Sequence, residues 1–376
     1  MARSALTRHV IERRLWGDTP FFLIDVGCSG GIEKRWDVFG DRLRAVGFDP
    51  LISEVDRLNS VNTRPSVLYE AAFVGCADYD ARFPRDMRKD PTSPRTLFDR
   101  TSAAAAQSRQ QMSYIQEVFN SSAPLVLSTR RVVLDEYLPP GEREQVDFIK
   151  VDTDGHDIEV VLGATGIMDA GGLLGLHVEA QFQGPHHELA NTFSNIDRVM
   201  RSHGFSLFDL STNRYSRAEL PATFVYDIAA QTVSGQLMWG DALYFRDLAA
   251  PLYEKAWRYT VTPERVMKLA CLYEHFGLAD CAAELIVKRG TFLDASTRGE
   301  LLDLLAGGGP GAYRELMSAF QADPTSFFRS RRGDGAEPID QKAHDLRERI
   351  ETLKAKNAQL RERLRDRKTR SQSRVR

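Results

Sequence analysis

The sequence predicts an α/β fold with a doubly wound, mostly parallel sheet, and three observations support this prediction. Short continuous apolar runs recur along the first two thirds of the chain, as in parallel strands that are buried on both faces. Segments with helical periodicity separate these runs. The connections between them are short, which indicates right-handed βαβ units within one sheet.

The elements follow one another in a regular order. Residues 5–16 alternate apolar and basic residues at helical spacing and predict an N-terminal helix, assigned to residues 1–20. A helix at about 51–60 and an amphipathic helix at 192–204 separate predicted strands. We expect these strands at residues 21–27, 45–50, 67–74, 125–134, 146–152, 174–182 and 205–210, with a closing edge strand at 238–247. They complete one domain over residues 20–247.

A long segment without clear periodicity interrupts this domain at residues 75–124. It contains several prolines, many charges and a small Ala/Ser tract. An insert of this length within an α/β domain is typical of a lid or of a partly disordered segment.

The last third of the chain changes in character. Residues 250–326 show helical patterns only, and 262–290 reads as a helical hairpin that turns near Gly277, with Thr262 as N-cap. We expect this helical domain to be a packing or interaction module. Residues 327–338 form a hydrophilic linker.

Heptad spacing beyond the linker predicts a parallel, dimeric coiled coil at 339–366. The seam positions are Ile339, Leu346, Leu353 and Leu360 at d, and Ala343, Ile350, Asn357 and Leu364 at a. Leu at d and a single Asn at a favour two parallel strands, so a homodimer is expected. The basic tail at 367–376 is either a solvated end or a contact with an anionic membrane surface.

Composition limits the function classes. The net charge is only −2, and the basic segment follows the coil instead of preceding it, so nucleic acid is not an expected partner. The four cysteines show no CxxC pairing, and neither a signal peptide nor an apolar run of 18 residues is present. These features are typical of a cytoplasmic protein with reduced thiols.

The Gly-rich turn after the first strand is the most informative local feature. Asp25 ends the strand, and Gly27 and Gly31 allow close approach of a ligand to the backbone. The glycine spacing departs from the dinucleotide GxGxxG pattern, which argues against an NAD-type dehydrogenase. An acid at this position suits a ligand with a cationic ammonium and sulfonium. Asp49 ends the next strand, where it either accepts both hydroxyls of a ribose or only forms an Asp-Pro turn.

A second motif carries a family resemblance. Residues 147–164, DFIKVDTDGHDIEVVLGA, resemble the signature of FkbM-type methyltransferases, F-I-K-I-D-V-E-G-x-E-x-x-V-L-x-G-A. The segments DVGCSGG, GFDP, STRRVVLDEYL and HVEAQF extend the resemblance over roughly residues 20–247. Asp154 and Asp157 stand where Glu is commoner, and the insert is long for the family.

The resemblance implies a class I methyltransferase fold with S-adenosylmethionine as donor and a hydroxyl of a sugar, glycan or glycolipid as acceptor. It places the methionine part of the donor near Asp25 and Gly27, the ribose near Asp49, and the adenine near residues 70–73. The residues expected to bind the donor are Asp25, Gly27, Ser29, Gly31, Asp49, Ala72, Phe73 and Asp152.

Methyl transfer to a hydroxyl requires alignment and removal of a proton. Asp152, Asp154 and His156 follow the strand at 146–152 and are the candidate catalytic residues. Asp154 is the preferred base, and His156 has a suitable ordinary pKa. Alternatively, Asp152, Asp154 and Glu179 hold a divalent ion such as Mg²⁺. A competing hypothesis from another class is a cofactor-binding scaffold that presents its helical and coiled-coil regions to a partner.

Overall fold

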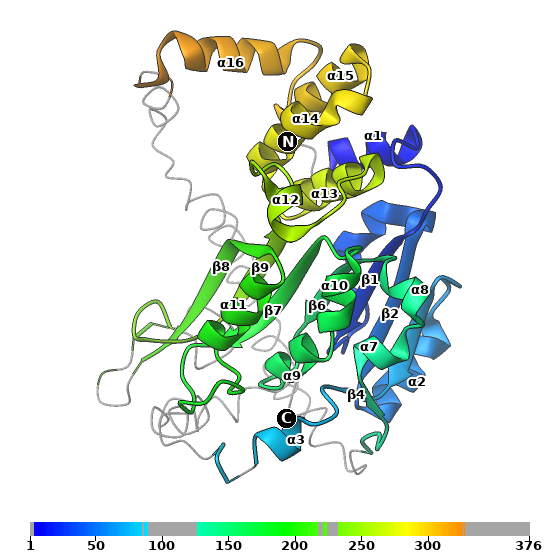
Figure 1. The fold of residues 1–376 in the computed structure, drawn as a ribbon, viewed down its shortest axis with the longest axis vertical. Coiled ribbons are helices and arrows are strands. Elements are labelled where there is room, and N and C mark those ends of the chain that lie inside the picture. Colours follow the sequence, from blue (N-terminus) through cyan, green and yellow to red (C-terminus); the bar gives the residue numbers. More distant parts are fainter. Residues whose placement is uncertain are drawn as a thin grey trace, which may run out of the picture. The chain divides into compact units, whose positions relative to one another are not determined.

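The protein is described by a computed structural model over residues 4–84, 86–88, 126–216, 220, 222–223, 232–325 and 327. Its central feature is a seven-stranded sheet with the order β3-β2-β1-β6-β7-β9-β8 (Figure 1). The strands are β1 (Phe21–Val26), β2 (Leu43–Asp49), β3 (Val67–Ala71), β6 (Val146–Val151), β7 (Gly175–Gln181), β8 (Phe205–Tyr215) and β9 (Gln236–Arg246). β9 runs antiparallel to both of its neighbours, and the other pairs are parallel. This is the predicted class I methyltransferase-like α/β fold.

The strand order places a topological switch point between β1 and β6. The chain moves outward from β1 through β2 to β3 and then returns to the other side of β1 as β6. At such a point the connections leave in opposite directions and open a crevice beyond the carboxyl ends of the strands. The loops that follow β1, β2 and β6 therefore meet at one edge.

The prediction of a strand over 125–134 is wrong for most of its length. Only Arg131–Val132 form a strand, β5, which pairs with β4 (Phe73–Val74) in a separate two-stranded sheet. The preceding residues bind the loop after β2 instead, because Ile52 N donates to Val126 O and Ser128 N donates to Pro50 O. The backbone groups of this segment are thus used outside the main sheet.

One face of the sheet carries the larger apolar core. Phe22, Ile24 and Val26 of β1 point to this face and are at most 2% exposed. Helices that precede and follow β6 in the chain lie on this face of the sheet. Figure 1 shows α9, α10 and α11 against β6 and β7. They are α7 (Leu134–Tyr137), α8 (Pro140–Arg143), α9 (Asp157–Leu162), α10 (Thr165–Ala170) and α11 (Phe193–Ser202).

The opposite face packs aromatic side chains against the N-terminal and C-terminal helices. Phe21 of β1 stacks on Phe39 of η1 (Lys34–Arg42), and Trp36 of η1 stacks on His275 of α13 (Pro263–His275). The remaining elements are α1 (Ala5–Glu12), α2 (Ile52–Val61), α3 (Tyr79–Arg82), α12 (Tyr253–Trp257), α14 (Ala279–Arg289), η2 (Gly290–Phe292) and α15 (Ala295–Leu305). Residues up to Pro310 form one compact unit.

The segment 262–290, for which a helical hairpin was expected, contains the helices α13 and α14. The Thr262 side chain accepts a hydrogen bond from Arg265 N, and Pro263 occupies the first helical position. Gly277 lies between the helices with a φ of +81°, where glycine avoids the strain that a side chain would cause. The turn chemistry therefore matches the sequence pattern.

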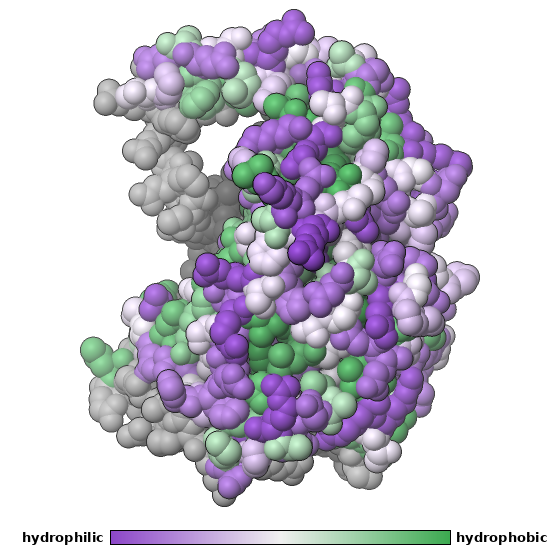
Figure 2. Space-filling view, in the orientation of Figure 1, coloured by the Kyte–Doolittle hydropathy of each residue, from purple (hydrophilic) through white to green (hydrophobic). Residues whose placement is uncertain are grey.

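A second unit begins at Gly311 and contains α16 (Ala312–Ala322). The predicted coiled coil at 339–366, the basic tail at 367–376 and most of the insert at 75–124 lie outside the described residues. Within the described residues, no helix combines the length and apolar character that crossing a membrane requires. Hydrophilic residues cover most of the face drawn in Figure 2, with hydrophobic residues in smaller groups between them.

Candidate active site

The loops that follow β1 and β6 come into close contact at the switch point. Gly27 has a φ of +83°, and a Cβ atom at this position would lie 1.7 Å from Asp152 O. Gly27 N and Cys28 N both donate to Phe48 O of β2. A side chain at Gly27 would thus force the β1 and β6 loops apart, which explains the glycine at this position.

A cavity of about 900 Å³ opens beside this contact. Eight of the predicted site residues line it: Gly27, Ser29, Asp49, Ala72, Phe73, Asp152, Asp154 and His156. They come from the ends of β1, β2, β3, β4 and β6. The volume lies toward the upper end of the roughly 300–1,000 Å³ typical of ligand pockets. The fold therefore brings most of the predicted residues together in one cavity.

Asp49 lies at the end of β2 in the cavity wall and is 8% exposed. Its Oδ1 accepts a hydrogen bond from Leu51 N at 2.8 Å. Burial raises the pKa of Asp49, while the backbone amides of Leu51 and Ser29 act in the opposite direction. The carboxylate is thus fixed by the backbone at the position where an acid can accept hydroxyl donors.

Asp25 is placed differently from the expectation, because it does not line the cavity. It is 1% exposed, and Lys150 Nζ lies 3.4 Å from its Oδ1. Burial raises the pKa of Asp25 to about 6, against the attraction of Lys150. Lys150 Nζ also lies 3.4 Å from Asp152 Oδ2. Asp25 therefore acts on the cavity indirectly, through a lysine that also contacts a cavity residue.

Two further predicted residues, Gly31 and Glu179, also lie outside the cavity lining. Gly31 has a φ of +90° and faces Leu58 and Tyr69. Glu179 lies on β7 opposite Asp241 of β9. Burial is the main cause that raises the pKa of Glu179 to about 9, and nearby aspartates add to it. Within the described residues, Glu179 Oε2 is buried without a hydrogen-bond partner.

The structure does not support the alternative of a divalent metal at Asp152, Asp154 and Glu179. Among the described residues, no three His, Cys, Asp or Glu side chains come together as a metal-binding group. Glu179 is set back on β7, whereas Asp152 and Asp154 lie in the loop after β6. The three carboxyl groups share an electrostatic environment without forming a common coordination site.

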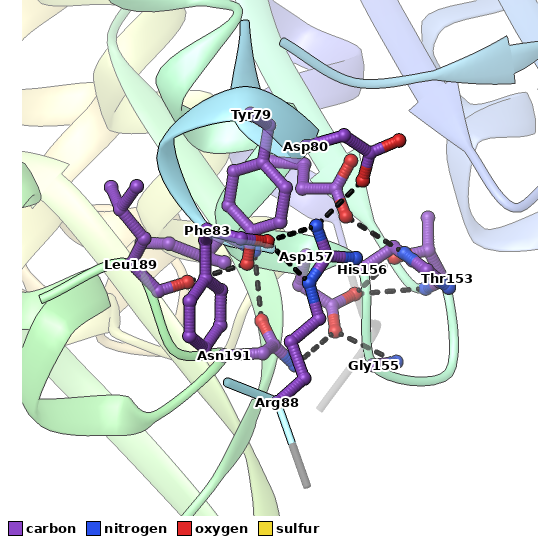
Figure 3. Close-up of polar contacts among 12 residues, drawn as sticks. Tyr79, Asp80, Phe83, Arg88, Thr153, Gly155, His156, Asp157, Leu189 and Asn191 are labelled. Atoms are coloured by element: carbon purple, nitrogen blue, oxygen red, sulfur yellow. Dashed lines mark hydrogen bonds and ion pairs between the residues drawn. The ribbon is translucent and has the colours of Figure 1, made fainter. Parts of the chain in front are cut away.

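The loop after β6 is held in shape by the buried side chain of Asp157 (Figure 3). Its Oδ1 accepts from Thr153 N and Oγ1, both at 2.8 Å. Its Oδ2 accepts from Gly155 N at 3.2 Å and from Asn191 Nδ2 at 2.9 Å. Asp157 is therefore a positioning residue for the loop that carries Asp152, Asp154 and His156.

Asp154 occupies a strained position within this loop. Its φ is +52°, a conformation that costs a non-glycine residue about 1–3 kcal/mol and that occurs preferentially at functional sites. Partial desolvation in the cavity wall raises the pKa of Asp154, followed by the charges of Asp152 and Asp157. A carboxylate with a raised pKa accepts a proton more readily near neutral pH, which suits a general base.

His156 is 63% exposed, and its Nδ1 lies 2.9 Å from Glu159 Oε1. The hydrogen bond to Glu159 is the main cause that raises the pKa of His156. The imidazole is therefore held toward its cationic form, in which it cannot accept a proton. This electrostatic setting favours Asp154 over His156 as the base.

Sequence reasoning missed several residues of the cavity wall. Two arginines, Arg88 and Arg131, line it from opposite ends of the insert, together with Asp80 and Glu159. Glu159 was recognisable as the residue three positions after His156 on one helix. Arg88 had no such signal, because it lies in the insert, which shows no periodicity. Arg131 was part of the strand predicted at 125–134, and that prediction gave no reason to place its side chain at the cavity.

Comparison with known proteins identifies part of this domain. Residues 46–207 match the methyltransferase FkbM domain. No curated protein matches the chain.

Among solved structures, a putative S-adenosylmethionine dependent methyltransferase from Listeria monocytogenes is 9% identical, with a TM-score of 0.28 over 64% of this chain and 98% of that one. A precorrin-6y C5,15-methyltransferase from Geobacter metallireducens is 9% identical, with a TM-score of 0.28 over 64% and 86% of the two chains. A 1,6-didemethyltoxoflavin-N1-methyltransferase from Burkholderia thailandensis, bound to S-adenosylhomocysteine, is also 9% identical, with a TM-score of 0.26 over 65% and 78%. Similarity at these scores carries no conclusion about activity.

Proposed function

We propose that the chain transfers a methyl group from S-adenosylmethionine to a hydroxyl oxygen of a sugar, glycan or glycolipid, because residues 46–207 match the methyltransferase FkbM domain. The observation that carries the proposal is the position of Asp49. Asp49 lies at the end of β2 in the cavity wall, and β2 is the neighbour of β1 at the switch point of the sheet.

The residues of the cavity fit the three parts of the donor. Asp49 offers carboxylate oxygens to the ribose hydroxyls, an interaction with charge-assisted hydrogen bonds. Phe73 and Ala72 offer an apolar surface to the adenine, and Asp152 offers negative charge to the cationic methionine end. Asp25 supports this end through Lys150 instead of by direct contact.

When bound, the sulfonium of the donor supplies an already activated methyl group. The protein aligns the acceptor oxygen with it and removes a proton. We propose that Asp154 is the base that accepts this proton. Its raised pKa and its exposed position in the loop after β6 suit the removal of a proton from a hydroxyl. Asp157 keeps this loop in position, and Glu159 keeps His156 toward its cationic form.

Calorimetry with S-adenosylhomocysteine tests the donor site on the full chain. We expect binding to the wild type and at least about 10-fold weaker binding to Asp49→Asn, because hydrogen bonds to a charged group are lost. Asp56→Asn is the matched control. It is the same substitution at an exposed position of α2 that does not line the cavity.

Three outcomes separate the alternatives. Absence of S-adenosylhomocysteine binding to the wild type would contradict the enzyme proposal. Binding of NADH in its place would favour a dehydrogenase. Equal binding to wild type and Asp49→Asn would contradict only the ribose assignment.

The acceptor class has its own test. Incubation of the protein with a donor that carries an isotopically labelled methyl group and with extract of the source cells should place the label on oxygen of a carbohydrate. Mass spectrometry of the carbohydrate, lipid and small-molecule fractions identifies the product. Label on nitrogen or carbon, or outside the carbohydrate and glycolipid fractions, would contradict the proposed acceptor.

A further inference from the structure

A small side pocket extends from the cavity beneath β4 and β5. It has a volume of about 150 Å³ and shares Phe73, Asp80, Arg131 and Glu159 with the main cavity. A water molecule occupies about 30 Å³ in the liquid, so the pocket has room for a group of a few heavy atoms. It is too small for a second nucleoside, and the lining residues that it shares join it to the main cavity.

The charged groups around this pocket differ in whether they have a partner. Asp80 Oδ1 accepts from Arg88 Nη2 at 2.6 Å (Figure 3). Glu159 Oε1 lies 2.9 Å from His156 Nδ1. Both carboxylates of the pocket are thus paired with cationic or partly cationic groups. Within the residues that the structure describes, the Arg131 side chain has neither a hydrogen-bond nor an ion-pair partner.

The other polar groups of the pocket wall are already engaged. Tyr79 donates its hydroxyl to Leu189 O, and Cys76 Sγ lies 3.2 Å from Asp78 Oδ1. Gly75 N donates to Val132 O. The pocket therefore offers a new ligand mainly apolar walls and one guanidinium with its donors unused.

From this arrangement we propose that the side pocket is an acceptor subsite for an anionic group, with Arg131 as its specificity-determining residue. The inference rests on the proposed methyltransferase function and extends it to an acceptor that carries a carboxylate or a phosphate. A guanidinium presents paired donors in one plane, which matches the two oxygens of either group. Arg88 and His156 neutralise Asp80 and Glu159, so Arg131 is the cation left for the ligand.

Binding of small anionic sugars to the S-adenosylhomocysteine-loaded protein tests this proposal. The probes are D-glucuronate, D-glucose 6-phosphate and inorganic phosphate, with D-glucose as the neutral comparison. We expect at least one anionic probe to bind more tightly than D-glucose. Arg131→Gln should weaken that binding about 10-fold or more, as expected for loss of a charge-assisted hydrogen bond. Arg131→Lys should restore part of it, because the charge returns without the planar pair of donors.

Arg130→Gln is the matched control, because Arg130 is the neighbouring residue, is ion-paired with Glu70 and lies outside the cavity lining. It should leave the binding of the anionic probes unchanged. Stronger binding of D-glucuronate than of the phosphates would identify a carboxylate acceptor, and the reverse order a phosphorylated one.

The proposal is overturned if no anionic probe binds in preference to D-glucose, or if Arg131→Gln and Arg130→Gln have equal effects. These results are distinguishable from failure of the donor site. In each variant, S-adenosylhomocysteine affinity is measured first and should equal that of the wild type. A protein that binds S-adenosylhomocysteine but no anion retains the proposed function and loses only the subsite.

Discussion

At the scale of single residues, Glu179 of β7 lies near several aspartates, one on β9 and others in the loop after β6. Glu179 and Asp241 face each other across β7 and β9, and the aspartates of the β6 loop add their charges. Burial and these charges raise the pKa of Glu179 to about 9. Glu179 therefore holds its proton at neutral pH, and this has a consequence for stability.

Glu179→Gln should stabilise the protein increasingly as the pH rises from about 5 to 9. An unfolded glutamate loses its proton near pH 4.3, whereas folded Glu179 keeps it until about pH 9. Folding of the wild type in this range takes up a proton, so its stability falls with rising pH. The neutral glutamine avoids this cost, by on the order of 1 kcal/mol or more at pH 8. Denaturant unfolding at pH 5, 7 and 9 measures the difference.

Glu136→Gln provides the comparison, because Glu136 is exposed on α7. The free energy of unfolding of Glu136→Gln should equal that of the wild type at each of the three pH values. A constant difference between Glu179→Gln and the wild type from pH 5 to 9 would show that Glu179 ionises normally in the folded protein.

Single residues also show where sequence reasoning succeeded and why it stopped. Asp49 and Asp152 were found because acids at the ends of parallel strands necessarily reach one edge of the sheet. Asp25 obeys the same rule, yet Lys150 from the neighbouring strand pairs with it and it lies outside the cavity lining. That pairing depends on the register of β1 against β6, which the motif alone does not specify. Arg131 was missed because it belonged to a strand predicted at 125–134, whereas the structure has only the two-residue β5 there, in a separate sheet beside the cavity.

At the scale of elements, the contact between α13 and the sheet includes a buried ion pair. Lys268 Nζ lies 3.0 Å from Asp147 Oδ2 and donates to Pro20 O at 2.8 Å. The two side chains are 3% and 7% exposed. Asp147 Oδ2 also accepts from Phe22 N, so the carboxylate joins β6, β1 and α13. No sequence pattern predicts this ion pair, because Asp147 and Lys268 lie far apart in the chain.

Lys268→Met should destabilise the folded protein by about 3–5 kcal/mol, because it leaves the Asp147 carboxylate buried without a counter-ion. Burial raises the pKa of Asp147 to about 6, and Lys268 pulls it down. Without Lys268, the pKa of Asp147 should rise further, so the loss of stability should be larger at pH 8 than at pH 5. Chemical unfolding at the two pH values measures both effects.

Two variants make this prediction specific. Lys268→Met combined with Asp147→Asn should be less destabilised than Lys268→Met alone, since no uncompensated charge remains. Lys288→Met removes the exposed partner of Glu284 on α14 and should change stability by less than about 1 kcal/mol. A double variant as unstable as Lys268→Met alone would show that lost packing, and not the buried charge, is responsible.

At the scale of the whole molecule, the sequence and the structure inform different parts of the chain. The regular order of strands predicted the sheet, because each buried strand needs a nearly continuous apolar run. The periodicity of the last third predicted the helices, yet not that α13 packs its aromatic residues onto the sheet of the same compact unit. Heptad spacing predicted a dimer through 339–366, a segment that lies outside the described residues.

We therefore expect the full-length chain to be a dimer of about twice 42.3 kDa, joined by residues 339–366. Leu346→Glu with Leu353→Glu places two like charges per chain in the predicted seam and should reduce the mass to that of one chain. Thr352→Glu with Ala355→Glu introduces the same charges on the outer face of the same helix and should leave the dimer intact. Sedimentation equilibrium measures the masses, and S-adenosylhomocysteine affinity should be equal in all three proteins if the seam only joins two complete sites. A dimer that survives both seam substitutions would place the contact between copies elsewhere in the chain.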